Sequence, residues 1–517
     1  MTPSVRASLG NLGGGFDVLV IGGGITGAGI AREAALRGLS TALVEARDFG
    51  EGTSSRSSRL IHGGLRYLEQ GRFHLVREAL RERRILLRLA PHLVRPLPFI
   101  LPVFLGDRVP RWKISAGLAL YDILAAGGNV RRHRTLGKRD LLLAEPLLRE
   151  RGLTGGAMYF DAQCDDARLV VATVRAAAGH GAKVANYMRV TGLIPTVAGI
   201  HGAYVRDELS GETGEVRARM VVNAAGPWAD AIRRLEDARA APLLRPTKGV
   251  HVVVPRARMG NRNAVIFTSP VDGRVMFVLP WGEWSYVGTT DTDFPLGPDE
   301  VTVEPSDVVY LLRSANSLFP SARLEPSDVI ASWAGLRPLL AADPSAPASA
   351  ISREHRVLRG PRGLYTIVGG KLTTWRSMAA ELTDQLVKSL GRHRHSAGRA
   401  GSETEPLPGG ETGVLDGFRG AGLDLGLSEA TVDHLLSHFG TETPAMYTLC
   451  RQRPELAAPL HPEHPAIGAE VVFAVQREFA MRTEDILARR LHLTTETRDQ
   501  GAAAVPRVTA LLAEGRP

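Results

Sequence analysis

The sequence predicts an α/β protein whose first unit is a Rossmann-type dinucleotide-binding fold, and three adjoining segments carry this prediction. Residues 16–21 form an apolar run typical of a buried strand, and a glycine-rich turn follows at 22–27. A helix-compatible stretch leads to a second apolar run at 41–44, which ends in Glu45. Strand, glycine turn, helix and second strand in this order are typical of a βαβ dinucleotide site.

The glycines and the acidic residue each have a physical reason in such a site. Gly22 permits the tight turn, Gly24 lets the backbone approach a pyrophosphate, and Gly27 lets the helix pack closely on the strand. The helix N-terminus offers free amides and a positive dipole end to the phosphates. Glu45 stands 18 residues after Gly27, where a carboxylate accepts an unphosphorylated ribose 2′-hydroxyl, so NADP is disfavoured.

Later segments predict a β-rich unit inserted into this fold. Apolar, β-branched runs at 249–254, 264–267, 275–279 and 285–287 predict an antiparallel sheet. This sheet interrupts the nucleotide-binding fold, because further strands of that fold are expected on both sides of it.

Two segments predict these further strands. Residues 219–227 read as a strand that breaks into a small-residue turn, and residues 363–374 as a strand, a Gly-Gly turn and a helix start. A nucleotide-binding domain split in this way suits the long flavin dinucleotide, whose isoalloxazine end needs backbone from distant segments around it. We therefore expect FAD rather than NAD.

Both ends of the chain differ from this central part. We expect a flexible lead-in at 1–15, a Gly/Ser/Pro-rich linker at 396–411 and a helical C-terminal domain at 412–517. Amphipathic stretches at 467–479 and 483–493 favour helices in that domain.

The composition is ordinary for a globular protein of 517 residues, with 44% hydrophobic and 23% charged residues. The two cysteines, Cys164 and Cys450, form no CxxC pair, so we expect a reducing compartment and no metal site. The N-terminus lacks the apolar segment of a secretory signal, and no apolar run is long enough to cross a bilayer. A cytoplasmic location is expected.

Positive charge is concentrated in one region. The net charge is +9, and residues 56–139 hold 18 Lys and Arg against 5 Asp and Glu. Four arginines in this region recur at helical spacing: Arg77, Arg81, Arg84 and Arg88. With apolar segments at 97–105 and 114–124, they favour an anionic membrane surface as partner, with a solvated basic face as the alternative. We expect no nucleic acid, because no binding module is recognisable.

A dense row of hydroxyl and amide groups follows Glu45. Residues 53–67 read TSSRSSRLIHGGLRY, in which serines and a threonine precede an imidazole, two glycines, an arginine and a tyrosine. Such a row offers donors to a pyrophosphate and to the edges of a flavin.

Together with other strings, this row closely resembles the FAD-dependent glycerol-3-phosphate dehydrogenases of the aerobic, quinone-reducing kind. The other strings are NAAGPW at 223–228, KGVHVVVP at 248–255, GTTDTD at 288–293, AGLRPL at 334–339 and VGGKLTTWR at 368–376. The resemblance runs in order from about Asp17 to Arg376 and continues more weakly to 488–493.

The resemblance implies an α/β fold with a glutathione-reductase-like FAD domain of the Rossmann type. This domain is expected to be interleaved with an α+β substrate domain that carries the antiparallel sheet, and an all-α C-terminal domain follows. Residues 16–395 would hold both domains, with the substrate sheet and cap mainly within 75–160 and 240–340.

The reaction implied by the resemblance is oxidation of sn-glycerol 3-phosphate to dihydroxyacetone phosphate. Hydride would pass from the substrate C2 to flavin N5, and electrons would then pass to ubiquinone or menaquinone. The implied location is the cytoplasmic face of the membrane, held peripherally, with a homodimer as an open alternative to a monomer.

By resemblance, four residues are assigned to the substrate, mainly to its phosphate: Arg66, Tyr67, Arg353 and Lys371. A dianionic phosphomonoester needs several permanently charged donors, which guanidinium groups supply. Arg337 is placed nearer the reacting carbon, where it could stabilise an alkoxide. The general base is His62 or His251, with a slight preference for His62.

The residues assigned to FAD come from five segments of the chain. They are Gly22, Gly23, Gly24, Ile25, Thr26, Gly27, Glu45, Ala46, Thr53, Ser54, Ser55, Ser58, Arg59, Ile61, His62, Gly63, Gly64, Ala225, Gly226, Gly370, Lys371, Leu372 and Thr373. One of them departs from the family pattern, because lysine is usual at the position of Arg59. If this position contacts the pyrophosphate, the charge is kept and the geometry changes.

Three alternatives stay open. The first is a glycerol-3-phosphate oxidase that passes electrons to O2, and the second is an amine or amino-acid oxidase-like flavoenzyme. The set of Arg66, Arg337, Arg353 and Lys371 favours a phosphate over the carboxylate of an amino acid. The third is a non-catalytic flavin-bearing scaffold, whose flavin glycerol 3-phosphate would not reduce.

Overall fold

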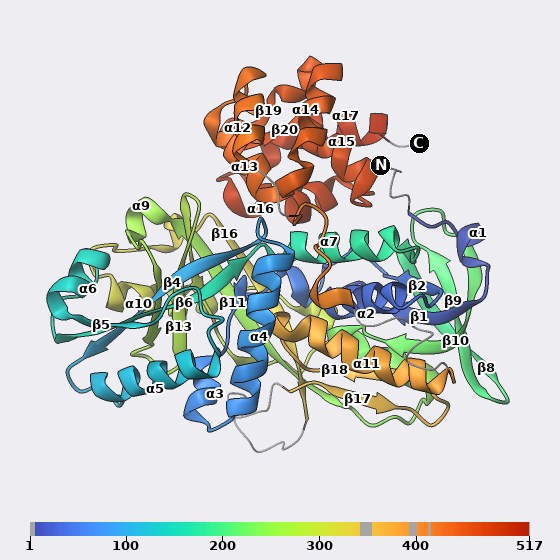
Figure 1. Ribbon diagram of the computed structural model, residues 1–517, viewed down its shortest axis with the longest axis horizontal. Coiled ribbons are helices and arrows are strands. Elements are labelled where there is room, and N and C mark those ends of the chain that lie inside the picture. Colours follow the sequence, from blue (N-terminus) through green and yellow to red (C-terminus); the bar gives the residue numbers. More distant parts are fainter. Residues whose placement is uncertain (1–5, 342–353, 392–400, 412–414, 516–517) are drawn as a thin grey trace.

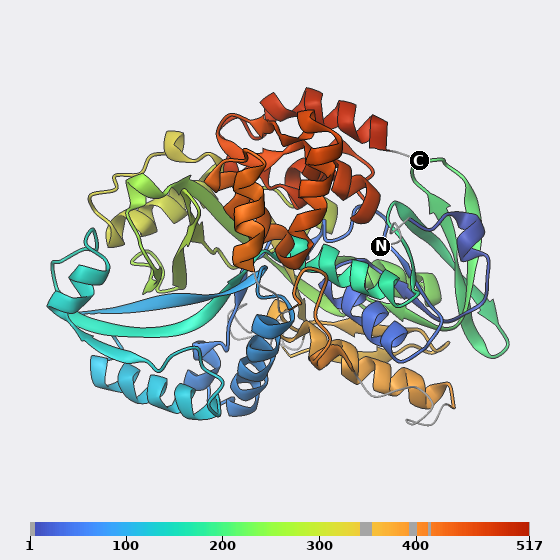
Figure 2. The ribbon, with the colours of Figure 1, turned by 45° about the horizontal axis from the view of Figure 1, so that its top comes forward.

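The computed structural model describes residues 6–341, 354–391, 401–411 and 415–515. Figures 1 and 2 show two sheet-containing units side by side, with the C-terminal helices packed against both. The chain enters the first unit at its N-terminus, passes into the second, and returns to the first before the C-terminal helices.

The first unit is built on a largely parallel sheet in the order β17-β18-β10-β1-β2-β7. All neighbours in it are parallel except β17 and β18. Its strands are β1 (Phe16–Ile21), β2 (Thr41–Val44), β7 (Lys183–Ala185), β10 (Thr213–Asn223), β17 (Arg356–Arg359) and β18 (Tyr365–Val368). The predicted strands at 16–21 and 41–44 are therefore confirmed. The strand β18 lies within one of the two predicted returns, and β10 begins before the other return and ends in it.

Both faces of this sheet are covered, which explains why β1 and β2 are buried at every position. Three helices, α2 (Ile25–Leu36), α7 (Asp166–Gly179) and α11 (Trp375–Ser389), cover one face (Figure 1). The hairpin of β8 (Met188–Thr196) and β9 (Gly199–Asp207) packs on the other face and extends from β10. The helix α8 (Ala229–Glu236) follows β10.

The N-terminal segment is ordered from residue 6 onward. The amide of Ala7 donates to the carbonyl of Val184 over 2.9 Å, and Leu12 in the short helix α1 (Leu9–Leu12) is fully buried. The expectation of a flexible lead-in is thus wrong for residues 6–15, because their apolar side chains join the core beneath the sheet. Residues 1–5 lie outside the described residues.

The second unit is a larger sheet in the order β15-β11-β14-β13-β12-β4-β6-β3, with β16 on β11 and β5 on β6. Its strands are β3 (Leu60–Ile61), β4 (Val94–Phe104), β5 (Arg134–Gly137), β6 (Leu153–Cys164), β11 (Leu244–Pro255), β12 (Ala264–Thr268), β13 (Val275–Trp281), β14 (Trp284–Gly288), β15 (Thr292–Asp293) and β16 (Ala331–Leu340). The four predicted strands of this sheet are confirmed. The sheet is not wholly antiparallel, because β12 pairs with β4 in parallel.

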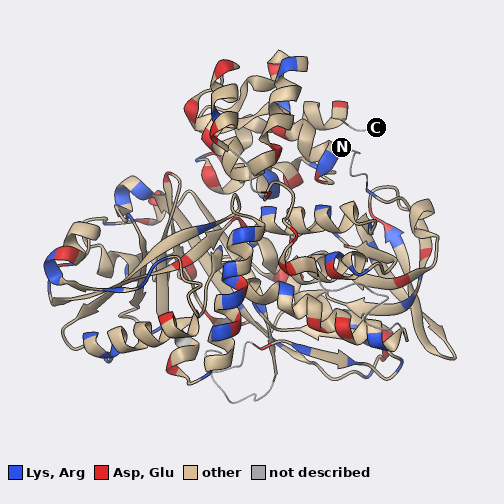
Figure 3. Cartoon of the chain, viewed as in Figure 1, with Lys and Arg blue, Asp and Glu red and all other residues tan. Residues whose placement is uncertain are grey.

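Helices cover both faces of this sheet as well. The helices α6 (Lys138–Ala144), α9 (Arg256–Met259) and α10 (Pro305–Leu318) pack on one face. The helices α3 (Leu65–Glu69), α4 (Phe73–Leu89) and α5 (Arg111–Leu124) pack on the other. The four arginines at helical spacing lie on the exposed face of α4, whose positively charged residues are visible in Figure 3.

The C-terminal domain is helical, as expected, apart from one hairpin. Its helices are α12 (Leu415–Asp424), α13 (Glu429–Phe439), α14 (Thr443–Gln452), α15 (Gly468–Arg477), the π-helix Asp485–Arg490, α16 (Leu493–Glu496) and α17 (Val505–Gly515). The strands β19 (Pro459–His461) and β20 (His464–Ile467) pair between α14 and α15, so the all-α expectation is wrong there. Prolines 459, 462 and 465 explain the hairpin, because proline at this spacing excludes a helix.

The expected linker at 396–411 is packed over the part that the structure describes. Arg32 donates to the carbonyls of Ser402 and Glu405, over 3.3 and 2.7 Å, and Leu407 is fully buried. Residues 401–411 therefore form part of the core around α2, and the expectation of an open linker is wrong for them. Residues 392–400 lie outside the described residues.

Candidate active site

A large cavity lies where the two sheets meet. Its volume is about 1920 Å3, and its lining comes from the carboxyl ends of β1 and β2, the loop that follows β2, and β11, β12, β13 and β16 of the second sheet. The carboxyl ends of parallel strands are where α/β folds bind their ligands. We therefore take this cavity as the candidate active site.

The glycine turn closes one end of the cavity. Gly22 has a φ of +109°, and a Cβ atom there would lie 2.6 Å from the carbonyl oxygen of Ala224. A Cβ atom on Gly27 would lie 1.9 Å from the oxygen of Gly22, so α2 can pack this closely only on a glycine. Gly24 has no side chain to cap α2, and the first turn of the helix, from Gly24 to Thr26, lines the cavity.

Glu45 lies at the end of β2 and lines the cavity. Its Oε2 accepts from the amide of Gly23 over 2.6 Å, and its Oε1 accepts from the amide of Arg47 over 2.9 Å. Burial raises the pKa of this carboxyl, while the two backbone hydrogen bonds oppose the shift. The carboxylate is thereby fixed beside the glycine turn, where a ribose hydroxyl could reach it.

The serine-rich loop connects the two units at the cavity. Thr53 Oγ1 donates to the carbonyl of Leu336 in β16 over 2.6 Å, and Ser54 Oγ accepts from the amide of Ile25 over 3.0 Å. Ser58 Oγ lies 2.9 Å from Nε2 of His251 in β11. The loop therefore contacts the start of α2 on one side and the second sheet on the other.

His251 is 3% exposed and lines the cavity from β11. Its ring stacks on Trp333 with centroids 5.1 Å apart and lies directly over Gly288, where a Cβ atom would be 2.1 Å from Cδ2. Burial, with the charges of Arg337 and Arg59, lowers the pKa of His251 to about 3. The imidazole is therefore neutral at physiological pH.

Arg337 reaches the cavity from β16. Its Nη1 donates to Asp291 Oδ1 over 3.0 Å, and its Nη2 donates to Thr289 Oγ1 over 3.0 Å and to the Thr290 carbonyl over 3.1 Å. The guanidinium group also lies against Gly249, where a Cβ atom would be 2.4 Å from Nη2. The side chain is 21% exposed, so a planar cation is held at the cavity wall with part of its surface accessible.

A second cation approaches from the Gly-Gly turn after β18. The ammonium group of Lys371 lies 3.6 Å from the centre of the Tyr67 ring, and both residues line the cavity. A cation this close to an aromatic face is attracted to it and kept in place. His62 is tied to the same turn, because its backbone amide and carbonyl hydrogen-bond to Thr373 Oγ1 over 3.1 and 3.3 Å.

Most of the residues expected from the sequence line this cavity. They are Gly22, Gly24, Ile25, Thr26, Glu45, Ala46, Thr53, Ser54, Ser58, His62, Gly64, Tyr67, Ala225, Gly226, His251, Arg337, Gly370, Lys371, Leu372 and Thr373. Arg353 lies outside the described residues, and the side chain of Arg66 is likewise not described.

Six expected residues do not line the cavity. They are Gly23, Gly27, Ser55, Arg59, Ile61 and Gly63. Gly27 and Ile61 are used in packing, and the amides of Gly23 and Gly63 are engaged by Glu45 and by the Tyr121 hydroxyl. The correction for Arg59 is larger. Its side chain turns away from the cavity into a buried cluster of aromatic and acidic groups, so it does not reach the place where FAD was expected.

Three residues that were not expected from the sequence form the surroundings of Arg337, namely Asp291, Thr289 and Gly249. Asp291 and Thr289 lie within the GTTDTD string that carried the family resemblance. Two carboxylates and three hydroxyls in a short string were a signal for a polar function, but their partner on β16 could not be identified from spacing.

Comparison with known proteins gives the family. Residues 17–384 match a family model described as FAD dependent oxidoreductase, and residues 400–515 match one described as the C-terminal domain of alpha-glycerophosphate oxidase. The chain is 37% identical over 486 residues to an aerobic glycerol-3-phosphate dehydrogenase of Staphylococcus haemolyticus, which covers 92% of this chain and 86% of the relative.

Two further matches agree with this. A glycerol-3-phosphate dehydrogenase 2 of Mycobacterium bovis is 40% identical over 507 residues, covering 96% of this chain and 84% of the relative. The crystal structure of a glycerol-3-phosphate dehydrogenase from Bacillus halodurans complexed with FAD superposes with a TM-score of 0.81 at 31% identity, covering 98% and 92% of the two chains. The chain belongs to the FAD-dependent glycerol-3-phosphate dehydrogenases.

Proposed function

We propose that this protein oxidises sn-glycerol 3-phosphate to dihydroxyacetone phosphate with FAD and passes the electrons to a membrane quinone. One observation carries the proposal. Cations and imidazoles from segments far apart in the sequence, Arg337, Lys371, His62 and His251, line one cavity that is continuous with the glycine turn of a dinucleotide site.

The residues present fit FAD. The first turn of α2, where Ser54 Oγ accepts from the amide of Ile25, and the close-packed turn at Gly22 and Gly27 bring backbone amides to the cavity, as a pyrophosphate requires. Glu45 would hold the ribose, and Ala225 and Gly370 would lie along the flavin. When bound, FAD supplies the hydride acceptor.

The substrate phosphate would be held at the Lys371 side of the cavity. A dianion in a largely enclosed site needs several cations around it, because it loses its water shell there. Lys371 over Tyr67 supplies one of them, and Arg66 and Arg353 are the further donors that the family resemblance implies. An amino-acid carboxylate carries one charge less and would leave these cations uncompensated.

Arg337 would act at the reacting carbon. Its guanidinium group is fixed by Asp291, Thr289 and Thr290, so it need not reorganise when negative charge develops on the substrate oxygen. Such preorganised positive charge stabilises an alkoxide as its proton leaves.

The two histidines have different environments, which separates their roles. A general base works best when its pKa lies near the working pH, and the pKa of His251 at about 3 is far below it. We therefore assign proton acceptance to His62 and hydrogen bonding in the neutral state to His251, through Ser58. Replacement of His62 by asparagine would then cost more activity at neutral pH than replacement of His251 by asparagine.

The test is an anaerobic titration of the purified flavoprotein with sn-glycerol 3-phosphate, followed by flavin absorbance. Loss of the long-wavelength band is the expected result. Protein that carries FAD and stays oxidised would contradict the proposal and would favour the amino-acid oxidase-like alternative, which glycine or a D-amino acid as reductant would check.

A membrane quinone as acceptor is favoured by the part of the cavity that α5 lines. Apolar side chains there, among them Leu101, Phe104, Ile114 and Leu120, lie with the cations Arg108 and Lys113 in the lining. This part runs along α5, which displays exposed apolar side chains and neighbouring cations to solvent, with Trp112 at 72% and Ile123 at 72% exposure. Aromatic and basic residues together suit the interface of an anionic membrane.

The electron acceptor is tested by reoxidation of the reduced flavin. A water-soluble quinone analogue should reoxidise it faster than air does, and the reverse order would make the protein an oxidase. Within the described residues, no helix has the length and apolar character to span a bilayer. We propose a peripheral position on the cytoplasmic face, and light scattering would distinguish the monomer from the homodimer that the sequence left open.

A further inference from the structure

Arg59 is buried between the C-terminal domain and the second sheet. It is 3% exposed, although it follows directly on the loop that lines the cavity. Its Nη2 lies 3.3 Å from Nδ1 of His492, and its Nη1 lies 3.6 Å from Oε1 of Glu496. Both of these partners belong to the C-terminal domain, so the guanidinium group connects that domain to the loop.

The same guanidinium group also binds the second sheet. Its Nη1 donates to the hydroxyl of Tyr286 in β14 over 2.9 Å, and its Cζ lies 4.4 Å from the ring centre of Trp281 in β13. Trp333 in β16 closes the cluster at 5.8 Å. The planar guanidinium group reaches all of these partners at once with separate donors, whereas the lysine that is usual at this position offers a single ammonium group.

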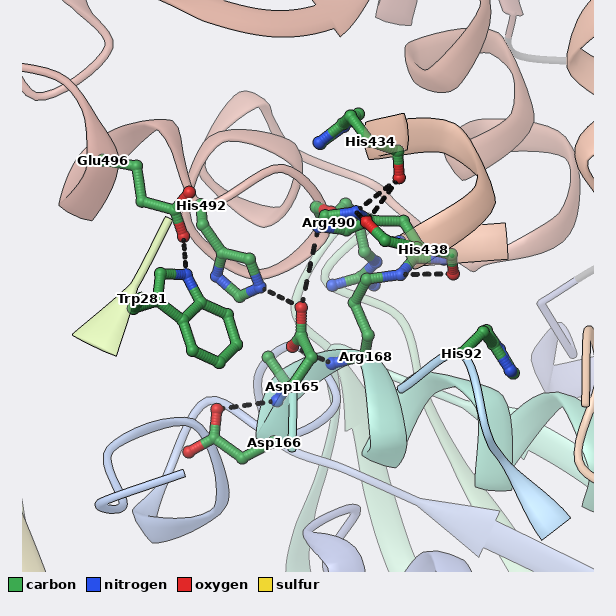
Figure 4. A network of polar contacts seen from close by, with 12 residues as sticks. His92, Asp165, Asp166, Arg168, Trp281, His434, His438, Arg490, His492 and Glu496 are labelled. Carbon is green, nitrogen blue, oxygen red and sulfur yellow. Dashed lines mark hydrogen bonds and ion pairs between the residues drawn. The ribbon is translucent and has the colours of Figure 1, made fainter. Parts of the chain in front are cut away.

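The C-terminal partners are themselves fixed. His492 Nε2 lies 2.7 Å from Asp165 Oδ2, and Trp281 Nε1 donates to Glu496 Oε1 over 2.8 Å, as Figure 4 shows. Because Nε2 faces a carboxylate and Nδ1 faces a guanidinium donor, the neutral imidazole with its proton on Nε2 satisfies both contacts. His492 therefore presents an acceptor to Arg59 in one fixed direction.

From Arg59 two short routes lead to the cavity. Along the backbone, the preceding residue is Ser58, whose Oγ lies 2.9 Å from Nε2 of His251. Through packing, Trp333 stacks on the His251 ring at 5.1 Å and meets the Tyr286 ring at 5.1 Å. The position of His251 thus depends on Arg59 along both routes.

We propose that Arg59 is a positioning residue through which the C-terminal domain holds Ser58 and His251 in place at the cavity. The inference rests on the proposed function insofar as His251 takes part in it. It gives the C-terminal domain a role in the reaction although none of its described residues lines the cavity.

The charge of Arg59 affects the pKa of His251, and a purely structural role of Arg59 would not predict this effect. Two guanidinium charges act on His251, that of Arg337 at the cavity wall and that of Arg59 behind Trp333, and both lower its pKa. Removing the charge of Arg59 would therefore raise the pKa of His251. A protonated His251 cannot accept the hydrogen bond of Ser58, so the loss of kcat/KM that follows protonation of His251, below the limb set by His62, should begin at a higher pH than in the wild type.

The test compares Arg59→Met with a matched variant at the same domain interface. Arg175→Met removes the bidentate pair with Glu442, whose distances are 2.6 and 2.7 Å, and Arg175 contacts neither Ser58 nor His251. Arg59→Met should lower kcat about 100-fold with a smaller change in KM, since a misplacement of about 1 Å has effects of this size. Arg175→Met should lower the melting temperature and leave kcat and the pH profile unchanged.

Two further variants complete the design. Arg59→Lys keeps the positive charge and loses the planar set of guanidinium donors. Compared with Arg59→Met, it should return the pH dependence of kcat/KM to that of the wild type and recover only part of kcat. His492→Asn is a substitution in the C-terminal domain, and asparagine tolerates the backbone φ of +58° at this position. It removes the contact of His492 with Asp165 in the first unit. His492→Asn should lower kcat, as Arg59→Met does. It also tests the inference if Arg59→Met does not fold.

The outcomes separate this inference from the proposed function. Failure of glycerol 3-phosphate to reduce the wild-type flavin would contradict the function. In that case the connection between the C-terminal domain and Ser58 is tested by the affinity for FAD. Arg59→Met should weaken FAD binding because Ser58 shifts, and Arg175→Met should leave FAD binding unchanged. If Arg59→Met and His492→Asn change only the melting temperature, as Arg175→Met does, Arg59 is a structural residue and the inference is overturned.

Discussion

Arg337 and Asp291 meet at the cavity wall through a 3.0 Å hydrogen bond between Nη1 and Oδ1, although 46 residues separate them in the sequence. The pair joins β16 to the loop between β14 and β15. It fixes the direction of the guanidinium group before any substrate enters, and the first prediction depends on this preorganisation.

Arg337→Ala should abolish measurable turnover while FAD stays bound. Loss of one preorganised donor at a developing oxyanion costs roughly 100- to 1000-fold in kcat. Asp291→Asn keeps the shape and removes the charge, and it should show a smaller loss. Steady-state kinetics with flavin quantification measures both. Arg245→Ala, which breaks an exposed pair with Asp293 on the same sheet, is the control, and retained turnover in Arg337→Ala would remove Arg337 from the mechanism.

Gly249→Ala should impair catalysis although it replaces no charged residue. The new Cβ would lie 2.4 Å from Arg337 Nη2, so the guanidinium group must move away from its position at the wall. We expect a loss of kcat with little loss of FAD. Gly420→Ala, where a Cβ would meet nothing within 4 Å, is the matched control. Equal kcat values for the two variants would show that the position of Arg337 is not critical.

Acid should destabilise the fold partly through His92. Burial, followed by the charges of Arg168, Arg95 and Arg175, lowers the pKa of His92 to about 3. The unfolded chain, with an ordinary pKa of about 6.5, binds the proton first. Between these values the free energy of unfolding therefore falls as the pH falls, by up to about 1.4 kcal/mol per pH unit.

His92→Gln should flatten this dependence between pH 6.5 and pH 4.5. Urea unfolding at several pH values measures the slope. His74→Gln serves as the control, because the side chain of His74 is 72% exposed. An unchanged slope in His92→Gln would mean that other groups, such as the buried His251, dominate the acid sensitivity.

Vesicle binding should depend on both the apolar residues of α5 and the basic residues of α4, if this surface meets the membrane as proposed. Trp112→Ser removes a side chain that is 72% exposed on α5 and should weaken binding to neutral and anionic vesicles alike. Reversing the charge of Arg77 and Arg84 on α4 should weaken binding to anionic vesicles only. Sedimentation with vesicles of each composition measures this. Tyr204→Ser, 43% exposed on the β8–β9 hairpin, is the control, and unchanged binding in the other variants would exclude this surface.

Local sequence patterns predicted most of the fold. The strands β1 and β2 and the glycine turn between β1 and α2 follow from neighbouring residues, because burial on both faces and a φ of +109° at Gly22 restrict which residues can stand there. The exposed face of α4 follows from the spacing of its arginines. The order at 6–15 and 401–411 could not be predicted, because it depends on partners far along the chain, such as Val184 and Arg32.

The candidate site shows the same division. The sequence by itself determined the dinucleotide turn, the family and the residue types that gather at the cavity, since these are encoded in short strings. Only the tertiary structure decided that Arg337 is held by Asp291 and that Arg59 turns away from the cavity toward His492. The physical reason is that a buried charge is directed by whichever distant groups can replace its lost water, and those groups become neighbours only when the chain is folded.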